Sequence, residues 1–183
     1  TTGDADAATD LSAKGIDNDV TIAIGKAGNV TGTATVTDSR TLASAVTGAT
    51  DASSDLKAIG IHLGNTKVTI GTTGNTTGTA TAAAPSVLST TTTGDASVGV
   101  EQTAIGIKGS GYDGMGALSS SGGSAISAGL AGNVIGRGTG SALGTANTIT
   151  GDALAGTEAF IAGIKKDDLS ADNVTAEALG TYG

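Results

Sequence analysis

The stretch Thr47-Gly48-Ala49-Thr50-Asp51-Ala52-Ser53-Ser54-Asp55-Leu56-Lys57-Ala58-Ile59-Gly60-Ile61 is one of four copies of a fifteen-residue block. The other copies occupy residues 2–16, 93–107 and 150–164, and all four align without a gap. Thr-Gly opens every copy, Gly-Ile closes it, and an acidic residue stands at the ninth position: Asp10, Asp55, Glu101 and Glu158. Internal repetition of this kind predicts a repeat fold, and it takes precedence over local sequence patterns.

A second motif follows the block at a regular distance. Gly-Asn begins residues 28–33, 74–79 and 132–136, and a weaker echo starts at Asn173. Together the two signals predict repeats at 1–46, 47–92 and 93–149 and a truncated fourth repeat at 150–183, which form one structural domain. The third repeat carries a Gly- and Ser-rich insertion at 108–130. Because insertions in repeat proteins map to surface loops, we expect this one to be dispensable for folding.

The segments after the first two blocks predict β-hairpins. Residues 20–24 and 30–36 alternate between branched apolar residues and small or polar ones, as half-buried strands do. Gly28-Asn29 between them favours a turn. The pattern recurs at 67–70 and 76–82 around Gly74-Asn75. We therefore expect antiparallel pairing within each repeat.

The block itself can be interpreted as a strand or as a helix. A strand is favoured in most copies, because the Gly before the closing Ile costs about 1 kcal/mol inside a helix. In the fourth copy, however, Leu154, Ile161 and Ile164 share one helical face, which predicts a short helix near 152–166. A second short helix is expected near 39–46, capped by Asp38 or Ser39. The predicted fold is mainly all-β, with tandem repeats of about 46 residues built from hairpins and stacked as a β-solenoid or a β-sandwich.

The composition limits what a single chain can bury. Aromatic residues make up 2% of the 183 residues, there are 31 glycines, and Trp is absent. The core must therefore consist of Ala, Val, Ile, Leu and Thr, while ordering glycine costs more backbone entropy than ordering other residues. We expect an isolated copy to be marginally stable and to gain from burial against a neighbouring chain.

Charge and cysteine content argue against several classes of binding partner and binding site. The formal net charge of −8 and the pI of about 4.3 disfavour nucleic acid and anionic membrane surfaces, both of which attract Lys and Arg. The uncharged runs 68–94 and 114–136 are too polar for membrane insertion. The chain has no Cys, which excludes disulfides and thiolate metal sites. Thr1 in place of an initiator Met predicts a processed, exported protein, located outside the cell or on its surface.

The candidate chemical groups are few. His62 is the only histidine and has no neighbouring Cys or second His, so neither metal binding nor catalysis is expected of it, and the chain is not expected to be an enzyme. The acid of each block is interpreted as a solvated or capping carboxylate. The alternative is Ca²⁺ bound by Asp4, Asp6 and Asp10, or at the equivalent Asp51 and Asp55, because calcium prefers oxygen ligands. That loop lacks the glycine and terminal Glu of an EF-hand, and no other cofactor is expected.

Two further patterns can be interpreted as functional sites: glycine clusters as phosphate-binding loops, and Asn-x-Thr sequons as glycosylation sites. The glycine clusters at 106–109 and 136–140 lack the strand–loop–helix context and the lysine of a phosphate-binding loop. Asn29, Asn75 and Asn173 each begin a glycosylation sequon, although a Thr-rich chain also produces sequons by chance.

In composition the chain is similar to secreted bacterial fibre, surface-layer and adhesin repeats. The predicted function is a structural subunit of an extracellular filament or surface layer, which polymerises head to tail when residues 1–16 of one copy complete the fourth repeat of another. The alternative is an adhesin or virion fibre segment that binds a glycan or host surface, with Tyr112 to Met115 as its contact loop.

Overall fold

The computed structural model describes residues 2–18, 22–24, 29–63, 68–70, 75–108, 126–127, 133–165, 169–170 and 173–182. These residues form a mostly β structure of parallel sheets, and no helix occurs among them. Accordingly, the part of the chain that the structure describes has no helix long and apolar enough to cross a membrane. The predicted predominance of β-structure is confirmed.

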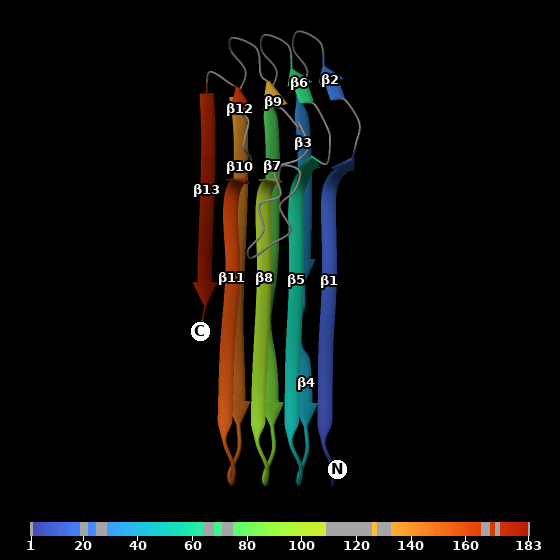
Figure 1. The fold of residues 1–183 in the computed structure, drawn as a ribbon, viewed down its shortest axis with the longest axis vertical. Coiled ribbons are helices and arrows are strands. Elements are labelled where there is room, and N and C mark those ends of the chain that lie inside the picture. The colour runs from blue at the N-terminus through green and yellow to red at the C-terminus, as the bar shows by residue number, and fades with distance from the viewer. Residues whose placement is uncertain are drawn as a thin grey trace.

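Two large sheets lie face to face (Figure 1). The first runs in the order β1 (Ala5–Asn18), β5 (Thr50–Leu63), β8 (Ala96–Lys108), β11 (Ala153–Lys165). In the second, β3 (Val30–Thr37) and β4 (Thr41–Ser44) both pair with β7 (Thr76–Thr90), which is followed by β10 (Asn133–Asn147) and β13 (Asn173–Tyr182). A small third sheet contains β2 (Ile22–Ile24), β6 (Val68–Ile70), β9 (Ile126–Ser127) and β12 (Leu169–Ser170). The chain therefore rises through the first sheet, passes the short strands and descends through the second (Figure 1).

The four block copies pair with one another in parallel and residue for residue. Asp10 is paired with Asp55, Asp55 with Glu101, and Glu101 with Glu158. Parallel bridges also join the four threonines that open the blocks: Thr2, Thr47, Thr93 and Thr150. Equal positions of the copies thus lie side by side across the first sheet.

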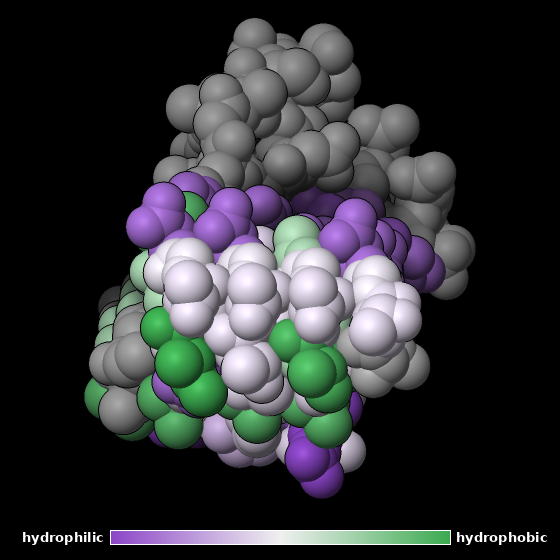
Figure 2. Space-filling model, turned by 90° about the horizontal axis from the view of Figure 1, so that it is seen from below, coloured by the Kyte–Doolittle hydropathy of each residue, from purple (hydrophilic) through white to green (hydrophobic). Residues whose placement is uncertain are grey.

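In the second, third and fourth copies, the Thr-Gly dipeptide lies in the turn by which the chain passes from the second sheet to the first. Gly3, Gly48, Gly94 and Gly151 have φ values of 124°, 123°, 123° and 135°, a region that residues with a Cβ rarely adopt. The backbone nitrogen of Gly48 donates to the carbonyl of Thr93 at 2.9 Å, so successive turns are hydrogen-bonded to one another. Figure 2 looks up at this end of the molecule and shows a row of near-neutral residues.

The core between the two large sheets is made of small and branched side chains. Strand β3 alternates between buried and exposed residues along its whole length. The buried cluster contains Leu56, Val36, Val87, Val98, Val100 and a set of alanines: Ala34, Ala43, Ala52, Ala58, Ala80, Ala82, Ala84, Ala104 and Ala142. Such side chains leave a thin core, so the two sheets can approach closely.

The glycine near the end of each block lies against the backbone of the opposite sheet. A Cβ on Gly60 would lie 2.6 Å from the carbonyl oxygen of Gly106 and 2.7 Å from that of Thr79. Real Cβ atoms do not approach backbone atoms this closely, so only glycine fits. The recurrent Gly-Ile is therefore explained by packing of backbone against backbone.

The predicted hairpins are wrong. Strand β2 pairs in parallel with β6, and β3 pairs in parallel with β7, instead of with each other. Alternation shows which face of a strand is buried but does not identify its partner. Here the partner is the equivalent strand of the next copy, because the chain passes to the opposite sheet instead of reversing within one. Gly28 and Gly74 of the expected turns lie outside the described residues.

The two predicted short helices are also wrong. Residues 41–44 form β4, and 153–165 form β11, which pairs along its length with β8. Asp38, one of the two proposed caps, instead closes a corner between β3 and β4, where its carboxylate accepts hydrogen bonds from the backbone nitrogen of Arg40 and the hydroxyl of Thr41. Tertiary pairing with an available strand outweighs the local preference. Of the insertion at 108–130, only residues 108, 126 and 127 are described.

Candidate functional site

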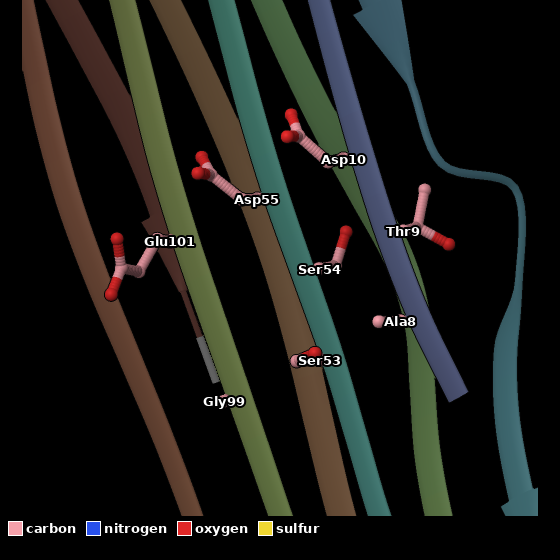
Figure 3. Close-up of a pocket in the computed structure, with 8 residues that line it drawn as sticks. All are labelled: Ala8, Thr9, Asp10, Ser53, Ser54, Asp55, Gly99 and Glu101. Atoms are coloured by element: carbon pink, nitrogen blue, oxygen red, sulfur yellow. The ribbon is translucent and has the colours of Figure 1, made fainter. Parts of the chain in front are cut away.

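The outer face of the first sheet carries a groove lined by two rows of block residues. Position seven of the block supplies short residues, Ala8, Ser53 and Gly99, and position nine supplies the carboxylates of Asp10, Asp55 and Glu101. With Thr9 and Ser54 these residues line a groove of about 350 Å³. Figure 3 shows Asp10, Asp55 and Glu101 on neighbouring strands β1, β5 and β8, beside the row of short residues. No atom lies within 4 Å of where a Cβ on Gly99 would be, so the groove is open at that point.

The groove presents oxygen atoms and negative charge. Strands in a sheet lie about 4.7–4.9 Å apart, which places each carboxylate one strand spacing from the next. Like charges directly opposite each other in a sheet destabilise it, and exposure to water reduces that cost here because Asp10, Asp55 and Glu101 are exposed. The groove can accept hydrogen bonds from hydroxyl groups or attract cations. Its eight lining residues include no His, Lys or Cys.

The structure does not bring the predicted calcium ligands together. Asp6 and Asp10 lie on the same extended strand, where a rise of about 3.3 Å per residue separates them by roughly 13 Å. Asp4 instead accepts a hydrogen bond from the backbone nitrogen of Ala49 at 2.9 Å. The residues brought side by side are Asp6 with Asp51 and Asp10 with Asp55.

Among the described residues, no group of three or more His, Asp or Glu side chains could hold a metal ion. Calcium binding stays a prediction. Melting temperatures measured with calcium and with a chelator test it, and an unchanged value contradicts it.

His62 has an acidic partner that its own sequence neighbours do not indicate. Its Nδ1 lies 2.6 Å from a carboxylate oxygen of Asp17, and the Nζ of Lys14 donates to the other oxygen at 2.9 Å. The hydrogen bond with His62, followed by that with Lys14, lowers the pKa of Asp17. The alignment of the blocks could have revealed this pair, because Asp17 and His62 each follow the closing Ile of a copy. His62 thus lies in a surface ion-pair cluster, away from the groove residues.

The sequon asparagines occupy equivalent register positions. Asn29 is exposed, and its side-chain oxygen accepts a hydrogen bond from the backbone nitrogen of Asn75 at 3.0 Å. Asn173 is paired with Asn133 at the start of β13. Glycosylation at these positions stays a prediction.

No protein-family model, curated protein or solved structure matches this chain.

Proposed function

We propose that the chain is a structural subunit of an extracellular filament or surface layer, and that its four block copies lie on successive coils of a parallel β-solenoid. The observation that carries the proposal is the in-register pairing of the copies: β1, β5, β8 and β11 stack in sequence order, as do the strands of the other two sheets. A stack of this type gains a further coil with the same contacts as the previous one.

The edges of this stack support growth by addition of copies. Within the described residues, β1 pairs only with β5, and β11 pairs only with β8. Unpaired edges are templates for another strand, and a head-to-tail contact that does not close a ring produces an open filament. The aromatic-poor composition and the absence of Cys support the extracellular fibre class by similarity of composition.

Sedimentation velocity and negative-stain microscopy over a range of protein concentrations test this proposal. The expected result is a set of particles of constant width whose length increases with concentration. A monomer at every concentration and salt condition would overturn the proposal.

A glycan-binding adhesin or virion fibre segment is the second candidate, and the groove over Asp10, Asp55 and Glu101 favours it. Carboxylates and hydroxyls in a row can accept hydrogen bonds from successive hydroxyls of a sugar chain. A glycan array distinguishes the candidates: a hit that Asp55→Asn abolishes, with an unchanged melting temperature, supports the adhesin. The earlier contact segment, Tyr112 to Met115, lies outside the described residues.

A further inference from the structure

We infer that two copies of this chain join in the same register that relates the block copies within one chain: β11 of one copy pairs in parallel with β1 of the next, and β13 pairs with β3. This inference rests on the proposed function and specifies the joint on which that function depends. Four features of the two edges support it.

The first feature is the core column at block position ten. Leu11, Leu56, Gln102 and Ala159 are neighbours in turn across the sheet. Leu56 is 0% exposed because strands flank it on both sides, whereas Leu11, on the edge strand, is 37% exposed. A second copy in register would place its Leu11 beside Ala159 of the first, which covers Leu11 as Leu56 is covered.

The second feature is a pair of hydrogen bonds, each donated by the backbone of one copy of the block to a side chain of the preceding copy. At block position three, Asp4 accepts from the nitrogen of Ala49 at 2.9 Å, and Asp95 accepts from the nitrogen of Asp152 at 3.0 Å. Both bonds run in the same direction along the stack. Asp152 holds this position in the fourth copy and is exposed, so in the joint its carboxylate accepts from the nitrogen of Asp4 in the next copy.

The third feature is charge. The column that follows the blocks contains Asp17, His62, Lys108 and Lys165. An acid therefore stands at one edge of the sheet and a base at the other. Continuation of the register puts the position of Lys165 beside Asp17 of the next copy, and opposite charges in neighbouring strands stabilise their pairing.

The fourth feature is the distribution of exposed large hydrophobic residues. Within the described residues they lie toward the two ends of the stack: Leu11, Leu42 and Val46 at one end, and Leu143, Ile149, Leu154 and Leu179 at the other. None lies on the central strands β5, β7 and β8. Figure 2 shows two green groups below the row of turns, one at its left end and one right of its middle. This distribution favours a second copy that docks end to end, because such a contact would bury the apolar side chains at the ends of the stack.

Introduced thiols test the register, because the chain has no Cys of its own. Ser12 and Phe160 occupy the same block position, in a column with Lys57 and Thr103. The joint would bring Ser12 of one copy beside Phe160 of another, and the strand spacing of about 4.8 Å is within the range of a disulfide. Thr35 and Leu179 form the equivalent pair on the second sheet.

In the experiment, chains carrying Ser12→Cys are mixed with chains carrying Phe160→Cys under mild oxidation, and the products are separated on a non-reducing gel. The expected result is a disulfide-linked dimer from the mixture and none from either chain alone. The pair Thr35→Cys and Leu179→Cys should cross-link in the same way. This second pair keeps the register testable if a cysteine at Ser12 or Phe160 prevents folding. The control combines Ser12→Cys with Leu154→Cys, which is displaced by six residues, or roughly 20 Å, and should not cross-link.

The outcomes separate the joint from the function. If filaments form but the matched pairs fail to cross-link, or the displaced pair cross-links equally well, the register is wrong and the structural role stands. If Ser12→Cys chains cross-link with themselves, copies meet head to head and the inference fails. Absence of any association overturns both the inference and the proposed function.

Discussion

At the scale of single residues, glycine has a conformational role in the turns and a packing role between the sheets. Gly48 has a φ of 123°, and a Cβ on it would lie 2.6 Å from the backbone of Gly3. Gly60 needs the absence of a side chain because backbone from the opposite sheet and from the neighbouring strand lies against it. Gly99, by contrast, faces open space. Three glycines in the same protein are therefore expected to respond differently to the same substitution.

Gly48→Ala should lower the free energy of unfolding by about 1–3 kcal/mol, because the backbone conformation is strained for any residue with a Cβ and the turn must shift away from Gly3. Gly99→Ala is the matched control and should change it by less than about 1 kcal/mol. Urea denaturation of both variants measures the difference. Equal effects would contradict the assigned role of Gly48.

Asp17→Asn should lower the free energy of unfolding at pH 7 by about 0.2–1 kcal/mol, the range for exposed ion pairs. His62 and Lys14 lower the pKa of Asp17 in the folded protein. The stabilising contribution of Asp17 is therefore fully present above the ordinary aspartate pKa of about 4, and it is lost as the pH falls below that pKa.

Urea midpoints at pH 7 and at about pH 2–3 measure this effect, and wild type and Asp17→Asn should converge at the lower pH. Asp10→Asn serves as the control, because it removes the same charge from β1 and should cost no stability at pH 7. A difference between wild type and Asp17→Asn that is constant with pH would show that the ion pair is not its cause.

At the scale of a strand, the same block position has a different environment in the centre of a sheet and at its edge. Leu56 on β5 and Leu11 on β1 are register neighbours, yet only Leu56 is fully buried. The contribution of a leucine side chain to the free energy of unfolding therefore depends on whether a strand lies on each side of it.

Leu56→Ala should lower the free energy of unfolding by about 2–5 kcal/mol, as expected for a buried leucine that leaves a cavity. Leu11→Ala should cost less in the isolated chain, because its side chain is already partly in water. Chemical denaturation of both variants at concentrations too low for assembly provides the comparison. A larger loss for Leu11→Ala would mean that β1 is covered in the isolated chain.

At the scale of the whole molecule, assembly brings negative charges together. The chain has a net charge of −8, and its acid column would continue through the joint with Glu158 beside Asp10 of the next copy. Charged side chains at a sheet edge also restrain uncontrolled strand addition. Electrostatic repulsion thus opposes a contact that the apolar edges favour.

Assembly should therefore be faster in 150 mM NaCl than in 10 mM NaCl, because the Debye length falls from about 30 Å to about 8 Å. Glu158→Gln should increase the rate at low salt by removing one of the two charges that meet. Asp55→Asn removes the same charge from the same column away from the joint and should have a smaller effect. Light scattering measures these rates, and equal acceleration by both variants would show that net charge alone is responsible.

The sequence by itself determined the predominance of β-structure, the Thr-Gly and Gly-Ile signals, and the rows of the groove. Aligning the blocks places Ala8, Ser53 and Gly99 at one position and the acids two positions later, so the groove could have been anticipated from that alignment. Local period and residue type decide these features because they depend on which side of a strand each residue occupies.

Only the tertiary structure decided the pairing of the strands. Alternation in residues 30–36 is compatible with a hairpin or with a parallel partner, and the choice of β7 depends on contacts 46 residues away. The same non-local pairing makes residues 153–165 a strand, and it separates Asp6 from Asp10 along an extended backbone. Local sequence signals contain none of this information, because the free energy of each pairing depends on residues that become neighbours only when the sheets form.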